Sequence, residues 1–242
     1  MIRYLFAALL ALLPLAVHAQ TEQQTLVDRA TLSVQEMLGT SGGIDVHSLV
    51  RRAKGVLVCP RLFKVGFFFG GQGGGCVLVG RVPGDGWSGP AFYGLGSGSF
   101  GLQIGVQDSE IIFIVLTNKG LAALMNSQFK FGADADIAVA TIGGGIQGST
   151  TAALMADIVA VARNRGLFAG VSLEGSIMGA RGEWNQAYYG QPLSAQQIVI
   201  QLQGQNPGDA PLREVLARFS GGGPAGGPAG GPGGAPAGGP GG

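Results

Sequence analysis

The chain has 242 residues, of which 46% are hydrophobic and 12% are charged. Its 15 basic and 14 acidic residues give a net charge of +1, which argues against a general nucleic-acid-binding protein because such proteins concentrate positive charge. Glycine contributes 46 residues, so the fold should contain many tight turns, bends or close backbone contacts.

The first 19 residues predict a signal peptide. Arg3 supplies a positive charge, residues 5–15 form an apolar run too short to span a bilayer, and Val17-His18-Ala19 places small residues where a signal peptidase cuts. We therefore expect cleavage after Ala19 and export to the periplasm or out of the cell, with peripheral association at a membrane. Export implies an oxidising environment. A retained membrane anchor is the alternative interpretation of the same residues.

The other end of the chain predicts a disordered tail. Residues 221–242 are glycine, proline or alanine throughout, so they have no side chains large enough to offset the entropy of ordering. One domain is therefore expected over residues 20–220, a length that can bury a substantial core. Without Arg3 this mature chain has equal numbers of basic and acidic residues.

The first predicted elements are two helices and a set of glycine-rich strands. Apolar residues repeat at helical spacing over residues 21–38 and again over residues 46–54. Short β-branched or aromatic runs then predict strands at 55–59, 65–69, 76–79 and 101–106, with a turn at 84–88. The most apolar run, residues 111–116, predicts a central strand buried on both faces.

The second half of the chain continues this pattern and ends in helices. We expect a short helix at 121–126, strands at 137–141, 146–151 and 153–162, and further strand pattern over 166–175 and 179–189. A capping box at Ser194 and Gln197 begins a helix over 194–201, and an amphipathic helix over 211–219 closes the domain. The predicted fold is α+β, a single glycine-rich β-sheet or barrel-like domain with helices at its N- and C-terminal ends.

The stretch KVGFFFGGQGGGCVLVGR, residues 64–81, raises the question of a phosphate-binding loop. A P-loop needs a lysine directly after a glycine, and no lysine of the chain has one before it. A dinucleotide fingerprint starting at Gly71 and Gly73 would need its third glycine where Cys76 stands. The spacing Gly96, Gly98, Gly101 does match, but it leads into a predicted strand instead of a helix. The stretch is therefore interpreted as two strands joined or bent by a glycine turn.

Catalytic and metal-binding arrangements find little support. Residues 39–43 match Gly-x-Ser-x-Gly, yet a helix precedes them where a nucleophile elbow needs a strand. One mature histidine, His47, and two cysteines cannot supply the usual zinc spacings, so no metal and no cofactor is expected. Two carboxylate pairs, Asp108/Glu110 and Asp134/Asp136, would each share a strand face. They leave a hydrolase as a remaining alternative.

The two cysteines, Cys59 and Cys76, each lie at the end of a predicted strand. In an oxidising compartment they could form a disulfide that adds roughly 3 kcal/mol of stability in the chain-entropy model. Two buried thiols that never meet are the alternative. A membrane span over residues 137–156 is also considered, because this stretch carries no charge and has Gly144 and Gly148 at Gly-x3-Gly spacing. Its adjacent glycines and its Ser-Thr-Thr cluster favour buried strands.

Positive charge gathers between residues 51 and 81. This part of the chain contains no acid and holds six basic residues: Arg51, Arg52, Lys54, Arg61, Lys64 and Arg81. Such residues could form one basic face beside the phenylalanines at 63 and 67–69, and near an anionic bilayer each charge contributes on the order of 1 kcal/mol. A scattered, solvated set of charges is the alternative.

Several motifs resemble those of the SYLF-domain family. They are Ala53-Lys54-Gly55-Val56, the glycine-rich run at 70–75, Trp87-Ser88-Gly89-Pro90, Gly132-Ala133-Asp134-Ala135, the block ARNRGLFAGVSLEG at 162–175, and Tyr188-Tyr189-Gly190. The similarity covers residues 46–202, and the block at 162–175 is its most specific part.

The resemblance implies a non-enzymatic module that binds anionic phospholipids, phosphoinositides among them. The residues expected to hold the phosphate groups are Arg51, Arg52, Lys54, Arg61 and Lys64, with Arg163 and Arg165 next. Some eukaryotic members of the family also bind actin, a partner that an exported protein would not meet. The alternative function is a structural or protein-interaction module of the cell envelope without direct lipid binding.

Overall fold

The computed structural model describes residues 21–40, 45–66, 69–84, 86–100, 105–141, 145–147, 155–166, 173 and 175–221. The predicted signal peptide and nearly all of the predicted tail lie outside these residues, so both stay predictions. The same holds for much of the specific block at 162–175 and for most of the strand expected at 146–151.

Two helices open the domain, as the sequence predicts. Helix α2 (Glu22–Gly39) begins at Thr21, whose side chain accepts a hydrogen bond from the Gln24 amide, and buries Val27, Val34 and Met37 on one face. Helix α3 (Val46–Arg52) begins at Asp45, which caps the Ser48 amide in the same way. Each cap satisfies a backbone donor that the helix itself leaves open.

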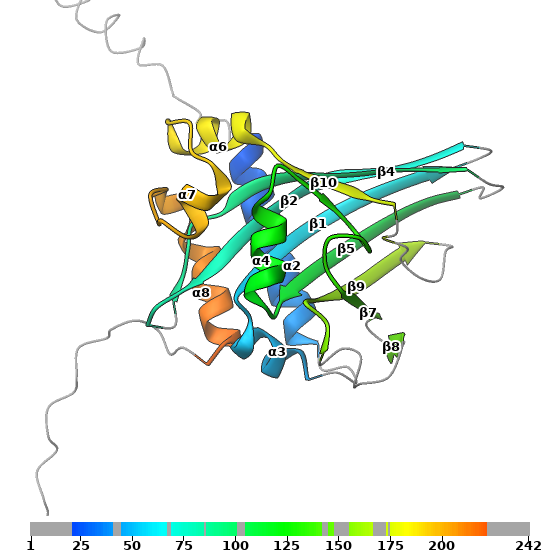
Figure 1. The fold of residues 1–242 in the computed structure, drawn as a ribbon, viewed down its shortest axis with the longest axis horizontal. Coiled ribbons are helices and arrows are strands. Elements are labelled where there is room, and N and C mark those ends of the chain that lie inside the picture. The colour runs from blue at the N-terminus through cyan, green and yellow to red at the C-terminus, as the bar shows by residue number, and fades with distance from the viewer. Residues whose placement is uncertain are drawn as a thin grey trace, which may run out of the picture.

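The middle of the chain forms one mixed sheet that curls into a half-barrel (Figure 1). Its described strands are β1 (Gly55–Gly66), β2 (Phe69–Val82), β3 (Gly86–Trp87), β4 (Ala91–Phe100), β5 (Gly105–Val115), β6 (Gln128–Lys130), β7 (Ile137–Thr141), β8 (Gly145–Gln147), β9 (Ile158–Gly166) and β10 (Ile177–Ala180). Their order across the sheet is β6-β10-β4-β2-β1-β5-β9-β7-β8, with β3 paired to β2. The pairing is antiparallel except between β7 and β9. The predicted α+β class is confirmed.

The stretch 64–81 is part of a long hairpin of β1 and β2. The two strands pair from Gly55 opposite Gly80 to Gly66 opposite Gly70, with a bulge between Val58 and Phe63. The prediction of two strands is confirmed, but the glycines at 70–75 do not form the turn. They lie inside strand β2.

The remaining helices are α4 (Asn118–Met125), α6 (Gly182–Tyr189), α7 (Ala195–Val199), the 3-10 turn η2 (Pro207–Asp209) and α8 (Ala210–Phe219). The strand pattern expected over 179–189 is wrong beyond β10, because Gly182–Tyr189 is helical. Asn185 explains this: it is fully buried, and its side chain binds the Phe92 amide and the Leu193 carbonyl. These tertiary hydrogen bonds override the β propensity of the tyrosines. Strand β9 also begins five residues later than the sequence predicts.

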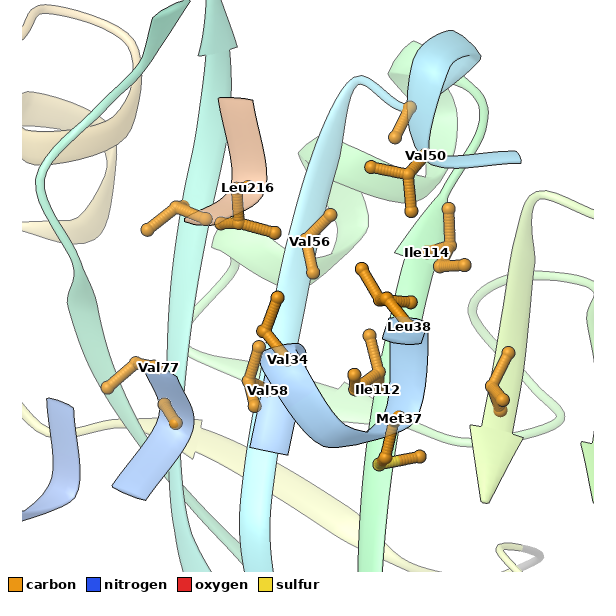
Figure 2. Close-up of a cluster of buried hydrophobic side chains, with 14 of the residues drawn as sticks. Val34, Met37, Leu38, Val50, Val56, Val58, Val77, Ile112, Ile114 and Leu216 are labelled. Carbon is orange, nitrogen blue, oxygen red and sulfur yellow. The ribbon is translucent and has the colours of Figure 1, made fainter. Parts of the chain in front are cut away.

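The sheet has an apolar core on each face. On one face, α2, α3 and α8 pack against alternate residues of β1, β2 and β5. Figure 2 shows Val34, Met37 and Leu38 of α2 pointing toward Val58 and Ile112 of the sheet. On the other face, α4 and α7 cover a second cluster that includes Leu57 and Phe113. The strand predicted at 111–116 is therefore buried on both faces, with Ile111 to Val115 at most 1% exposed.

Cys59 and Cys76 form a disulfide between β1 and β2, with their Cα atoms 4.2 Å apart. Both residues are fully buried in the second cluster. The bond lies near the middle of the hairpin, at the point where the helical cover of the sheet ends. Beyond it, the ends of β1, β2, β4 and β5 project past the helices, on the right of Figure 1.

Candidate functional site

Positive side chains gather at the covered end of the sheet, where α3 leads into β1. Arg51 and Arg52 end the helix, Lys54 follows in the connection, and Arg81 comes from the paired end of β2. Arg81 ties the group together: its side chain donates to the Arg51 carbonyl at 2.9 Å, and its amide donates to the Lys54 carbonyl at 2.9 Å. We name these four residues the basic corner. The first three are exposed and Arg81 is half-buried.

Among the residues that the structure describes, Asp45 is the acid that pairs with the basic corner. Its carboxylate lies 3.9 Å from Arg51, and both side chains are more than half exposed, so this ion pair adds little. The Ser48 amide, which donates to the same side chain, holds the pKa of Asp45 below its ordinary value. The charge of Asp45 therefore serves mainly the start of helix α3 and leaves the corner with an excess of positive charge.

The other predicted lipid-binding residues lie elsewhere. Lys64 is nine residues from Gly55 along an extended strand, about 30 Å from the basic corner at 3.3 Å per residue. Arg61 is bound to Asp108 at 2.7 Å, also toward the far end of β1. The structure therefore does not unite the predicted set into one basic face. It brings together Arg51, Arg52 and Lys54.

Arg163 has an acidic environment. Its guanidinium contacts the carboxylates of Glu36 on α2 and Glu110 on β5, and its side chain is 23% exposed. This arrangement joins the helix to the sheet and leaves little of the charge for an external anion. Arg165 is opposite Asp108 in the strand pairing, but its side chain is outside the described part of the structure.

The carboxylate pairs do not form a site for acid–base chemistry. Asp108 and Glu110 share a face of β5, but each is engaged by an arginine. Asp134 and Asp136 lie in the turn after β6, not on a strand as expected. The carboxylate of Asp134 accepts from the Lys130 amide, and that of Asp136 lies 3.7 Å from Lys119.

His47 is a packing residue. Its ring nitrogen is hydrogen-bonded to the Leu38 carbonyl at 2.8 Å, and its ring lies edge-on to Phe219. Among the described residues, no three histidine, cysteine or carboxylate side chains come close enough to hold a metal ion. No helix within the described residues is long and apolar enough to cross a membrane.

The sequence analysis did not predict a groove of about 630 Å³, which lies at the boundary between the covered and projecting halves of the sheet. Leu26 and Arg29 of α2 and Trp184 of α6 form one side, Phe63 and Arg61 of β1 the other, and the floor is Gly73 to Gly75. A signal for it exists in the sequence: glycines recur at every second position over 71–75 and 94–98, which places them on one face of their strands.

The family comparison identifies the family of the chain. The sequence profile of the Ysc84 family, described as "Las17-binding protein actin regulator", matches residues 96–219, just over half of the chain. The chain belongs to this family, which is the SYLF-domain family expected from the motifs. No solved structure gives a significant match.

Curated relatives agree with this assignment. Human SH3 domain-containing YSC84-like protein 1 is 27% identical over 189 residues, covering 78% of this chain and 55% of the relative. The Xenopus laevis protein of the same name is 31% identical over 144 residues, covering 59% of this chain and 43% of the relative. Protein YSC84 of Saccharomyces cerevisiae is 26% identical over 207 residues, covering 84% and 44%. The chain thus spans about half the length of these relatives. None of their names is that of an enzyme.

Proposed function

We propose that this chain is a non-enzymatic module that binds the surface of an anionic phospholipid membrane through the basic corner. The observation that carries the proposal is the gathering of Arg51, Arg52 and Lys54, all exposed, beside Arg81. Guanidinium and ammonium groups make strong, charge-assisted hydrogen bonds to phosphate oxygens. At about 1 kcal/mol per charge near an anionic bilayer, such a group supports reversible peripheral binding.

The family adds support of a different kind. SYLF-type motifs imply anionic phospholipid as ligand, and Arg51, Arg52 and Lys54 of the corner fall on the SYLF-like Ala53-Lys54-Gly55-Val56 motif or close before it. The family description also names a protein partner, Las17, for a member of the family. A protein-interaction module without lipid binding is therefore the outcome that a negative lipid experiment would favour.

The experiment is co-sedimentation with vesicles, using residues 20–242. Every described core residue lies between Val27 and Leu216, so this chain keeps the whole core. Binding is compared between phosphatidylglycerol-containing and pure phosphatidylcholine vesicles, at low and high salt. We expect binding to the anionic vesicles alone, and loss of it at high salt because salt screens exposed charges.

The variant Arg51→Glu/Arg52→Glu/Lys54→Glu tests the site. Removing three attractions of about 1 kcal/mol each lowers the affinity for anionic vesicles by roughly a hundredfold. Repulsion between the new glutamates and the anionic lipid lowers it further. Lys54→Glu alone has a matched control in Lys130→Glu, the same change at an exposed lysine on the edge strand β6. Equal binding of the folded triple variant and the unmodified chain would refute the proposed site.

A further inference from the structure

The projecting half of the sheet has one face without a helical cover, on the same side as α2. Strand pairing aligns a row across this face: Ile177, Gly96, Gly73, Phe63 and Asp108 are successive cross-strand neighbours. Directly paired residues point to the same side of a sheet. The next row places Gly98, Gly71, Val65 and Val106 together in the same way.

Apolar side chains and bare glycines therefore lie side by side on this face. Phe63, Val65, Val106 and Ile177 are 43%, 44%, 56% and 44% exposed, and they make up half of the large hydrophobic side chains that the described structure exposes. Between Phe63 and Ile177 the surface is only glycine backbone. This face continues without a step into the groove lined by Leu26 and Trp184, because Gly73 and Phe63 belong to both.

The fold does not require these glycines. A Cβ atom would meet nothing closer than 3.8 Å at Gly71, 3.5 Å at Gly73 and 4.0 Å at Gly96, and nothing within 4 Å at Gly98. None of the four has a positive φ. By contrast, a Cβ at Gly74, on the opposite face, would come within 2.2 Å of the Arg61 carbonyl oxygen. Glycine weakens a strand, so four unrequired glycines on one face point to something that approaches the backbone closely.

The chemistry of the face favours hydrocarbon over peptide. Strand β2 is paired with β4 on one side and β1 on the other along this stretch, so its backbone N–H and C=O groups are already engaged. The glycine floor therefore offers only CH surface. A peptide laid on it would leave its own backbone polar groups without partners, which costs free energy, whereas an acyl chain has none to satisfy.

The area of the face is too small for a second copy of the chain. Even at roughly 250 Å² for a whole large side chain, four half-exposed ones supply under about 500 Å². A stable protein–protein contact needs about 800 Å² from each partner. A single acyl chain, by contrast, fits a groove of about 630 Å³ that opens onto a flat apolar face.

Two arginines line this groove. Arg29 and Arg61 line it, and both also line the adjoining hollow of about 280 Å³ along α2. Arg61 is bound to Asp108, and Glu22 is the acid within the groove itself. The bond to Asp108 uses the Nε of Arg61, and a guanidinium has four further N–H donors, so Arg61 and Arg29 can both donate to a phosphate next to the acyl chain.

We propose that the groove and its glycine floor bind one acyl chain of an anionic phospholipid, with the phosphate directed to Arg29 and Arg61. This rests on the proposed function, because it deepens anionic phospholipid binding from surface contact to capture of a lipid chain. The groove is separate from the basic corner, which lies at the opposite end of β1. Each site can therefore be tested without the other.

The test uses Trp184, which lines the groove, as a reporter. A lysophosphatidylglycerol with a brominated acyl chain, kept below its aggregation concentration, is titrated into residues 20–242. Bromine quenches tryptophan only at short range. We expect saturable quenching that disappears in Trp184→Phe. The other tryptophan of the chain, Trp87, is only 4% exposed and is hydrogen-bonded to Ser220, so the bromine does not reach it.

Filling the floor gives the decisive variant. Gly73→Leu places a side chain where the acyl chain would lie, at a position with room for a Cβ atom. It should lower the affinity for the brominated lysolipid, measured by quenching, by about tenfold or more. Gly39→Leu is the matched control, the same change at a glycine with open space at the far end of α2. Arg29→Glu should weaken binding of the lysophosphatidylglycerol and leave unchanged the binding of a brominated monoacylglycerol, which has the same acyl chain but no phosphate.

Three results would overturn the proposal: no saturable quenching, equal affinity of folded Gly73→Leu and the unmodified chain, or saturation by a brominated free fatty acid with none by the lysophospholipid. Vesicle sedimentation separates the two proposals. Sedimentation without monomer quenching removes the groove and keeps the basic corner. Monomer quenching without sedimentation removes the basic corner and keeps the groove.

Discussion

The two halves of the β1–β2 hairpin are both paired antiparallel strand, but they have opposite surroundings. In the half next to α3, helices cover both faces, and Val56, Val58 and Leu57 are fully buried. In the half beyond the disulfide, Phe63 and Val65 are exposed on a face without a helix. A strand-rich, glycine-rich sequence thus encodes a packed core at one end and an open surface at the other.

The same contrast separates the glycines. Gly80, in the covered half, has Val199 within 2.5 Å of its would-be Cβ, so packing demands its small size. Gly73, in the projecting half, has no such neighbour. The contrast teaches that an unusual glycine content has two causes in this molecule, dense packing and an exposed bare face, and substitutions distinguish them.

The largest expected difference between the halves concerns two phenylalanines. Phe113 is 1% exposed and packs 5.2 Å from the ring of Phe131. Its replacement by alanine should lower the free energy of unfolding by about 3–5 kcal/mol. Phe63→Ala should cost about 1 kcal/mol or less, since Phe63 is 43% exposed and contacts chiefly Arg61. Chemical denaturation of both variants measures this; similar losses would contradict the division into covered and open halves.

The next effect compares neighbouring glycines that face opposite sides of one strand. Gly74→Ala would drive its methyl group into the Arg61 carbonyl oxygen and should destabilise the fold by about 3 kcal/mol. Gly73→Ala should be neutral or stabilise by about 0.5 kcal/mol, because alanine loses less chain entropy on folding. Denaturation midpoints of the pair give the answer. A large loss for Gly73→Ala would mean that the bare face is a packing requirement after all.

A smaller effect depends on pH and concerns a polar cluster at the covered end. The Asp157 carboxylate accepts two side-chain hydrogen bonds. One comes from the Lys119 ammonium at 2.7 Å, and the other comes from the Thr117 hydroxyl at 2.6 Å. These bonds, with that of Lys119 the largest cause, hold the pKa of Asp157 below its ordinary 3.8. An acid whose folded pKa is depressed stabilises the fold above its unfolded pKa, and this contribution disappears as the pH falls through the folded value.

The variant Asp157→Asn measures that contribution. As the pH falls from about 5 through the lowered pKa of Asp157, the unmodified chain should lose more stability than Asp157→Asn. Unfolding curves at several pH values follow it. Parallel losses in both proteins would show that this carboxylate does not stabilise the covered half.

The sequence predicted the parts of the fold that depend on local pattern. The helix at 46–54, the capping box at Ser194 and the doubly buried strand at 111–116 all follow from periodicity or capping chemistry. The sequence left two alternatives for Cys59 and Cys76, a disulfide or two separate thiols, and the structure contains the disulfide. The helix α6 could not be predicted in this way, because the buried Asn185 side chain accepts a hydrogen bond from Phe92, which is far away in the sequence.

The candidate sites show the same limit. Arg51, Arg52 and Lys54 are neighbours in sequence, and they stay together in space. Arg61 is only a few residues further along, but an extended strand carries it away from them, and Asp108 on β5 pairs with it. The groove was missed because its walls come from α2, α6 and β1, although the alternating glycines were visible as a period-two pattern.

The most direct test of the account crosses two variants with two forms of lipid. Arg51→Glu/Arg52→Glu/Lys54→Glu and Gly73→Leu are each measured for sedimentation with phosphatidylglycerol vesicles and for quenching by the brominated lysophosphatidylglycerol. The account predicts that the triple variant loses vesicle binding and keeps monomer quenching, while Gly73→Leu loses quenching and keeps salt-sensitive vesicle binding. Loss of both activities in both folded variants would contradict two separate sites at opposite ends of the sheet.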